Sequence, residues 1–218
     1  MKMTALIESH YPERIPNLEL MVDSLIENGI PKEEIIILVD HDTPFETKAK
    51  VMRSEYPMKI NWWHAVASVL DTDFVALLCD DLKLKKNSIK QLTNYALAFP
   101  DIDVFGFEGG ILAKTDNPYT DSKSHTVNEF EETDYIIRFY FGKPKAFANA
   151  LSLFHKLPKS EGIHDDLILS LSNKCGIVPT SETVGWEELP EQGVGYSKRA
   201  THYQERDSYA RTYWCRLD

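Results

Sequence analysis

The sequence has few features of secreted, membrane-spanning or disulfide-stabilised proteins. Its 218 residues include three cysteines, which are far apart and show no CxxC spacing. This number and spacing indicate neither a disulfide framework nor a structural zinc site. No apolar run approaches the roughly 20 residues needed to cross a bilayer, and the first residues lack the apolar core of a signal peptide. We therefore expect a cytoplasmic protein with no membrane span.

Positive charge is also scarce. The chain has 24 lysines and arginines against 34 aspartates and glutamates, which gives a net charge of -10. This balance argues against nucleic acid as a partner, because binding a polyanion needs concentrated positive charge. Hydrophobic residues make up 43% and charged residues 27%, which is ordinary for a globular protein. The length suits a single domain over residues 1–218.

Apolar strand patterns and amphipathic helix patterns alternate through the first hundred residues. This alternation predicts an α/β fold, with a mostly parallel central sheet flanked by helices. The apolar run 74–79 has no helical stripe, so it reads as a strand buried on both faces. We predict strands at 4–9, 35–40, 58–62, 74–79 and 103–112, and helices at 17–29, 43–56, 62–70 and 84–99.

The second half of the sequence is less regular. Residues 114–132 are polar and turn-forming without periodicity, which is typical of a functional lid or a disordered segment. Residues 165–176 have the pattern of a helix that ends at Gly176. Two glycines near residue 110 indicate a strand whose backbone can be approached closely by another group.

Acidic residues follow the predicted strands at the points where ligands gather in α/β sheets. Because the carboxyl ends of parallel strands border a crevice, acids that follow two such strands should lie at one edge. Oxygen ligands suit Mg²⁺ or Mn²⁺, and a histidine among them favours Mn²⁺. A cation there would hold nucleotide phosphates. The candidate clusters are Asp40 with Asp42, Asp80 with Asp81, His164 with Asp165 and Asp166, and His202.

Each cluster also has a purely structural interpretation. Asp42 is placed to cap a following helix, and Asp80 and Asp81 are placed to stabilise a turn. Asp165 and Asp166 would be favourable at a helix N-terminus through the helix dipole alone. A histidine in a polar loop, such as His202, is ordinarily solvated. The residue types alone leave both interpretations open.

Three segments together resemble the GT-A glycosyltransferases, which use nucleotide-diphosphate sugars. These are the strand ending IIILVDHDT, the strand ending LLCDDLKL and the segment HDDLILSLSNKCG. The resemblance extends over about residues 3–205. In its compact size, the chain is similar to bacterial family-2-like or viral catalytic domains. It implies a donor-binding half at about 1–112 and an acceptor-binding, catalytic half at about 113–218, within one domain or as part of a longer glycosyltransferase.

The resemblance also implies roles for particular residues. Asp40 would contact the base or ribose of the donor. Asp81 would be the direct metal ligand, with Asp80 nearer the ribose and His202 as a further ligand. Asp165 or Asp166 would be the base of an inverting hexosyl or deoxyhexosyl transfer from a UDP-sugar to a glycan or small hydroxyl acceptor. Lys198 and Arg199 would clamp the diphosphate, or would be ordinary surface cations.

One position departs from the family pattern. Many members begin the acidic metal motif with aspartate, whereas this sequence has Cys79. A thiol on a buried strand is a small core residue more often than a ligand of a hard cation. We therefore expect a site that relies on one direct carboxylate, the diphosphate oxygens and His202, with moderate metal affinity when no nucleotide is bound.

Other functions fit parts of the sequence. The run VDHDTPF resembles the nucleophile motif of haloacid-dehalogenase-like phosphatases, with Asp40 as nucleophile and Asp42 as acid. However, that motif normally follows the first strand of its domain, and here a strand and a helix precede it. A nucleotidyltransferase would need a glycine-rich phosphate loop after the first strand, where IESHYPER stands instead. A catalytically inactive sugar-nucleotide-binding module is the third alternative, and Cys79 is its only support.

Overall fold

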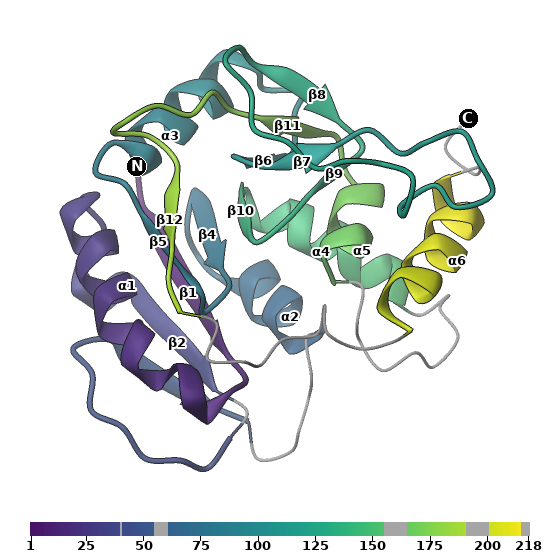
Figure 1. Ribbon diagram of the computed structural model, residues 1–218. Helices are drawn as coiled ribbons and strands as arrows, with labels where there is room; N and C mark the ends of the chain where they lie inside the picture. Colours follow the sequence, from purple (N-terminus) through teal and green to yellow (C-terminus); the bar gives the residue numbers. More distant parts are fainter. Residues whose placement is uncertain (40, 55–60, 155–164, 191–200, 215–218) are drawn as a thin grey trace.

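An eight-stranded sheet forms the centre of the molecule (Figure 1). The structure is a computed structural model and describes residues 1–39, 41–54, 61–154, 165–190 and 201–214. Along the sheet, the strands are β3 (Lys50–Arg53), β2 (Ile35–Val39), β1 (Met3–Ser9), β4 (Phe74–Leu78), β10 (Phe139–Gly142), β6 (Val104–Gly106), β11 (Cys175–Ile177) and β8 (Glu131–Thr133).

The sheet is mostly parallel, as predicted. Four of its seven neighbouring strand pairs are parallel, among them both pairings of β1. The other three pairs are antiparallel, because β10 runs against β4 and β6, and β8 runs against β11. Two small antiparallel ladders lie beside the sheet. They pair β5 (Leu82–Leu84) with β12 (Trp186–Glu188), and β7 (Gly109–Gly110) with β9 (Tyr135–Ile136).

Helices cover both faces of the sheet (Figure 1). Because side chains alternate between the faces of a strand, β4 contributes Phe74, Ala76 and Leu78 to one core and Val75 and Leu77 to the other. The first core includes residues of α1 (Ile15–Glu27) and α3 (Ser88–Ala98). The second includes residues of α2 (Asn61–Val69), α4 (Pro144–Phe154), α5 (Asp165–Leu171) and α6 (His202–Trp214). The prediction of an α/β fold with a mostly parallel central sheet flanked by helices is confirmed.

The end of α1 shows how the sequence fixes one boundary. The amide of Gly29 donates to the carbonyl of Ile26 at 2.9 Å, and the amide of Ile30 donates to that of Leu25 at 3.1 Å. This pair of hydrogen bonds is a Schellman motif, which needs a left-handed residue after the helix. Gly29 supplies it with φ +87°, so the prediction that the helix ends at Gly29 is confirmed.

Several predicted elements were wrong in their type or in their boundaries. Residues 43–49 are not helical, and Lys50–Arg53 form β3, which pairs with β2. All four β3 side chains are exposed, so this edge strand has no apolar pattern to reveal it. Asn61 and Trp62, predicted to end a strand, begin α2, while 58–60 lie outside the described residues. Helix α5 ends at Leu171, and Gly176 lies in β11.

The glycines near residue 110 accommodate the chain itself. A Cβ atom on Gly109 would lie 2.2 Å from the carbonyl oxygen of Tyr135 on the paired strand β9. The predicted strand at 103–112 is therefore two strands, β6 and β7, and the close approach expected there is made by β9. In the part of the chain that the structure describes, no helix is long and apolar enough to cross a membrane.

Candidate functional site

The order of the strands puts Asp80 and Asp81 beside a switch point of the sheet. From β1 the chain proceeds to β2 on one side of the sheet, and β4 later pairs on the other side of β1. Such a reversal opens a crevice at the carboxyl ends of the two strands, where α/β proteins bind ligands. Asp80 and Asp81 follow β4 after a single intervening residue, Cys79, and the short 3₁₀ helix Pro12–Arg14 follows β1.

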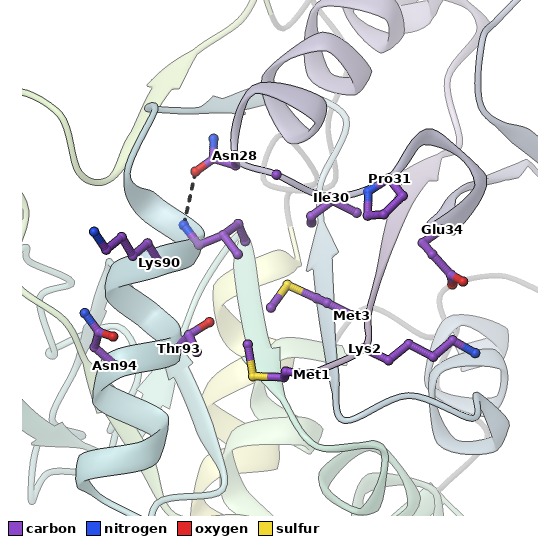
Figure 2. A pocket seen from close by; sticks show the side chains of 12 residues that line it. Met1, Lys2, Met3, Asn28, Ile30, Pro31, Glu34, Lys90, Thr93 and Asn94 are labelled. Carbon is purple, nitrogen blue, oxygen red and sulfur yellow. Dashed lines mark hydrogen bonds between the residues drawn. The ribbon is translucent and has the colours of Figure 1, made fainter.

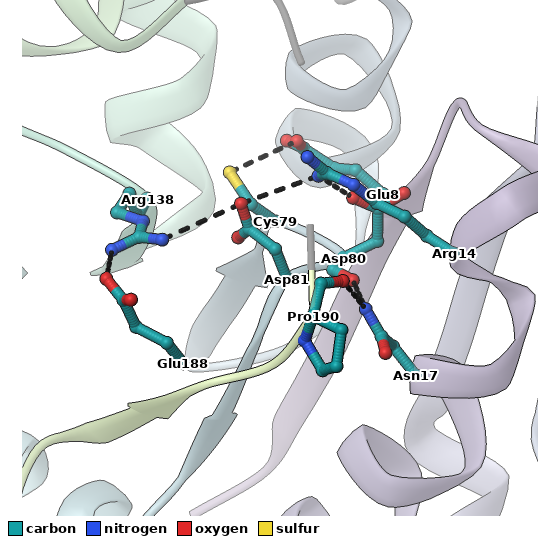
Figure 3. A network of polar contacts seen from close by, with 9 residues as sticks. All are labelled: Glu8, Arg14, Asn17, Cys79, Asp80, Asp81, Arg138, Glu188 and Pro190. Atoms are coloured by element: carbon teal, nitrogen blue, oxygen red, sulfur yellow. Dashed lines mark hydrogen bonds and ion pairs between the residues drawn. The ribbon is translucent and has the colours of Figure 1, made fainter. Parts of the chain in front are cut away.

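Arg14 binds the acidic pair from the β1 side (Figure 3). Its Nη1 lies 2.5 Å from Oδ1 of Asp80 and 3.4 Å from Oδ2 of Asp81. All three side chains are buried. The amide of Asn17 adds a hydrogen bond of 2.9 Å to the carbonyl oxygen of Asp80 and one of 3.0 Å to that of Pro190. The start of α1 therefore fixes the position of the acidic turn.

Arg138 approaches Asp81 from the opposite side (Figure 3). Its Nη2 lies 3.7 Å from Oδ2 of Asp81, and its Nη1 lies 2.8 Å from Oε1 of Glu188 on β12. Its carbonyl oxygen accepts a hydrogen bond from the amide of Cys79 at 3.0 Å. Two guanidinium groups thus flank one carboxylate at the crevice.

The backbone of Arg138 is strained. Its φ of +68° is the only positive value at a non-glycine residue of the described chain. Such a conformation costs an ordinary residue about 1–2 kcal/mol. Strained residues cluster at functional sites, where the surrounding structure holds them in place.

Two carboxylate oxygens at the site have unsatisfied hydrogen-bonding capacity. Within the described residues, Oδ2 of Asp80 and Oδ1 of Asp81 are buried and have no hydrogen-bond partner. A buried, unpartnered carboxylate oxygen is costly unless something binds it. Mg²⁺ commonly binds through one or two carboxylates plus substrate phosphates. The pair therefore fits a divalent cation whose other ligands come from a bound phosphate group and water.

Burial dominates the acid–base behaviour of Asp80. The pKa of this carboxyl rises from 3.8 to about 6, because burial disfavours the charged form more strongly than Arg14 favours it. The nearby charge of Asp81 raises it further. Asp80 is therefore ionised at neutral pH and begins to be protonated just below it.

Cys79 does not belong to the buried core. Its side chain is half-buried, and its Sγ lies 3.8 Å from Oε2 of Glu8, near the end of β1. Glu8 is itself buried. The thiol therefore lies at the edge of the crevice, whereas the sequence favoured a core position.

Asp166 is engaged in a separate buried ion pair. Its Oδ2 lies 2.5 Å from Nη1 of Arg206 on α6, and its Oδ1 accepts the amide of Leu167 at 2.9 Å. Both side chains are buried. Asp166 therefore ties α5 to α6 in this structure. Asp165 is the first residue of α5, and its side chain lies outside the described set.

His202 does not complete a metal site with the acidic pair. It is the first residue of α6 and is buried, not solvated as a loop histidine would be. In the described ranges, no three histidine, cysteine, aspartate or glutamate side chains are arranged to hold a metal ion. The geometry thus leaves Asp80 and Asp81 without the predicted third ligand.

Other predicted residues cannot be placed. Asp40, Lys198, Arg199 and His164 lie outside the described residues. Asp42 is exposed, and no helix follows it, so it does not act as a helix cap.

A large pocket lies away from the acidic pair (Figure 2). It measures about 710 Å³ and is lined by residues at the start of β1, after α1 and on α3. The start of β1 is the sheet edge opposite to the carboxyl ends. This pocket therefore lies at the edge of the sheet opposite to the acidic pair.

Solved structures share this fold. The 1–349 fragment of S. aureus TarS in complex with UDP-GlcNAc matches with a TM-score of 0.57 and 13% identity, over 91% of this chain and 61% of that one. HddC from Yersinia pseudotuberculosis matches with a TM-score of 0.52 and 13% identity, over 88% and 96%. No protein-family model and no curated protein matches the sequence. The chain has a GT-A-type fold and spans about three fifths of the TarS fragment.

Sequence reasoning missed both arginines of the site. Arg14 lies in HYPERIP, where the pattern indicated only a turn, and its partners Asp80 and Asp81 are more than 60 residues away. Arg138 lies inside an apolar run and reads as an ordinary strand residue. A charged residue in the run YIIRFYF was the one signal that could have singled it out.

Proposed function

We propose that the protein is a glycosyltransferase that transfers a sugar from a nucleotide-diphosphate donor to a hydroxyl group. The acidic pair after β4 carries this proposal, because it lies at the switch point of the sheet and presents two unpartnered buried oxygens. The phosphatase motif around Asp40 normally follows the first strand of its domain, whereas β1 and α1 precede β2 here. The UDP-GlcNAc complex of the fold relative TarS supports a UDP-sugar as the donor class.

The acidic pair and the two arginines divide the work of binding the donor. Asp81 would hold Mn²⁺ or Mg²⁺ through its free oxygen, and Asp80, fixed by Arg14, would face the ribose and contribute a second oxygen. A bound cation would neutralise the charge that develops on the departing diphosphate. Arg138 would contribute positive charge at the same place. Lys198 and Arg199 remain candidates for the same task.

The proposal assigns proton removal to the start of α5. In an inverting transfer, a carboxylate takes the proton of the acceptor hydroxyl as its oxygen attacks the anomeric carbon. Both oxygens of Asp166 are engaged, so we assign the base to Asp165 and a supporting role to Asp166. Residues 1–112 would then bind the donor, and 113–218 would bind a glycan or small hydroxyl acceptor within this domain or a longer protein.

Donor turnover tests the proposal. A transferase slowly hydrolyses its donor when no acceptor is present, so we expect nucleotide release from a hexose or deoxyhexose donor in Mn²⁺ and none in EDTA. Asp81→Ala should abolish this release, and Asp165→Asn should lower it while sparing nucleotide binding. Asp101→Ala is the matched control, because Asp101 is an exposed acid elsewhere on the chain.

The outcomes separate the alternatives. Phosphate release from simple phosphate esters without donor turnover would favour the phosphatase, with Asp40 as its nucleophile. Nucleotide binding without turnover of any donor would identify an inactive sugar-nucleotide-binding module. Turnover unchanged in Asp81→Ala would contradict the assigned site.

A further inference from the structure

A second pocket lies in the other half of the chain. It measures about 370 Å³ and is built from the loop before β8, strand β9 and the start of α6. The crevice of Asp80 and Asp81 uses none of these segments. The pocket is lined by Tyr119, Thr120, Ser122, Ser124, Tyr135 and Tyr203.

Aromatic rings form the walls of this tyrosine pocket. The ring of Tyr119 lies 5.2 Å from that of Tyr135 and 6.4 Å from that of Tyr203, centroid to centroid. Tyr135 is buried, whereas Tyr203 is 54% exposed. The negative face of an aromatic ring attracts the slightly positive edges of apolar groups. A pyranose ring presents such an edge through its C–H groups.

Hydroxyl groups supply the polar part of the lining. Hydroxyls both donate and accept hydrogen bonds, which matches the hydroxyls of a sugar. Ser122 Oγ already lies 2.9 Å from the Tyr135 hydroxyl, so part of this network exists without a ligand. None of the six lining residues is charged, and the carboxylates behind them, Glu108 and Asp207, accept from the hydroxyls of Ser124 and Thr120. The chemistry therefore favours a neutral saccharide over a phosphorylated or acidic ligand.

Helix α6 holds the pocket in shape. Asp207 Oδ1 accepts the amides of Tyr119 at 2.8 Å and Thr120 at 2.9 Å, and the Thr120 hydroxyl donates to the other carboxylate oxygen. The guanidinium of Arg206 lies 4.8 Å from the centre of the Tyr119 ring. A preorganised site loses less entropy when its ligand binds. The loop predicted to be a lid or a disordered segment is thus anchored at this point.

We propose that the tyrosine pocket is a saccharide subsite that binds one or two neutral sugar units of the acceptor glycan. The assignment of the bound saccharide as the acceptor rests on the proposed transferase function. Arg206 connects the pocket to α5, the helix that begins with the assigned base, because it contacts Tyr119 and pairs with Asp166. The subsite would hold the acceptor chain while its terminal hydroxyl reaches the donor.

Saccharide binding in the absence of nucleotide tests the subsite. The probes are methyl glycosides and linear di- to tetrasaccharides of glucose, galactose, N-acetylglucosamine and rhamnose, at millimolar concentration. Saturation-transfer NMR should detect at least one of them on the wild-type protein. Tyr203→Ala should weaken that binding at least fivefold, and Tyr203→Trp should restore it, because stacking needs a ring face.

Controls separate this test from the test of the transferase. Leu97→Ala removes a comparably exposed side chain from α3 and should leave saccharide binding unchanged. The affinity for nucleotide with Mn²⁺ should be the same in Tyr203→Ala and the wild type. No binding of any probe, or binding that survives Tyr203→Ala, overturns the subsite whatever the nucleotide results. If the wild type binds no nucleotide, the proposed transferase function is overturned, and the result on saccharide binding is unaffected.

Discussion

The buried carboxyl of Asp80 should make the stability of the protein depend on pH in a defined window. Its pKa is about 6 in the folded chain, against 3.8 when it is free in water. Between these two values the folded state holds a proton that the unfolded state has lost. Stability therefore falls as the pH rises from about 4 to 6, and this contribution is constant outside that window.

The size of the effect follows from the same two values. Each pH unit between them corresponds to about 1.4 kcal/mol, so ionised Asp80 costs the folded chain about 3 kcal/mol. Asp80→Asn removes the titration and keeps an oxygen that accepts from Arg14. Arg14 also keeps Asp81 at 3.4 Å, so it is not left without an anion. The free energy of unfolding of the variant, relative to that of the wild type, should thus rise by about 3 kcal/mol as the pH increases from 4 to 7.

Urea unfolding in EDTA at pH 4, 5, 6 and 7 measures this difference. Subtracting the wild-type curve from that of Asp80→Asn cancels the titration of all other carboxyls. Asp101→Asn, an exposed control, should give a flat difference. A flat difference for Asp80→Asn as well would refute the reasoning, because it would mean that Asp80 titrates alike in the folded and unfolded chains.

Three further substitutions test individual contacts. Gly29→Ala should lower the free energy of unfolding by about 1–2 kcal/mol in urea, because φ is +87° there and a Cβ would meet no other atom; no change would refute the role of the left-handed cap. Arg138→Gly should be about 1 kcal/mol more stable than Arg138→Ala, since only glycine avoids the strain at φ +68°, and equal stabilities would show that the strain is absent. Arg206→Met should cost about 3–5 kcal/mol by leaving Asp166 buried without its partner, and the double variant with Asp166→Leu should recover most of it in a thermal melt; no recovery would assign the loss to Arg206 packing.

The sequence predicted the parts of the fold that have a strong local pattern. Buried parallel strands such as β1, β2 and β4 are continuous apolar runs, and α1 combines an apolar stripe with a glycine stop. The edge strand β3 was missed because its side chains are all exposed and only pairing with β2 defines it. Pairing of this kind depends on the tertiary fold.

The candidate site was predictable only in part. Asp80 and Asp81 were found because they end an apolar run, and that position locates them in the crevice. Arg14 was not found, because a turn of mixed composition gives no indication of a partner more than 60 residues away. Asp166 and His202 were found by their types, but the pattern could not reveal that Arg206 binds Asp166 and that His202 is buried at the start of α6.

The central claim is that Asp80 and Asp81 hold a metal-bound nucleotide diphosphate. A thermal-shift panel of UDP, GDP, CDP and ADP, each with Mn²⁺, Mg²⁺ or EDTA, tests it on the wild type and Asp81→Asn. A ligand at about 100 times its dissociation constant adds about 2.7 kcal/mol, which corresponds to roughly 5–10 °C at this chain length. We expect one nucleotide, UDP by preference, to give this shift only with a divalent cation and only in the wild type. No shift with any nucleotide, or an equal shift in EDTA or in Asp81→Asn, would contradict the claim.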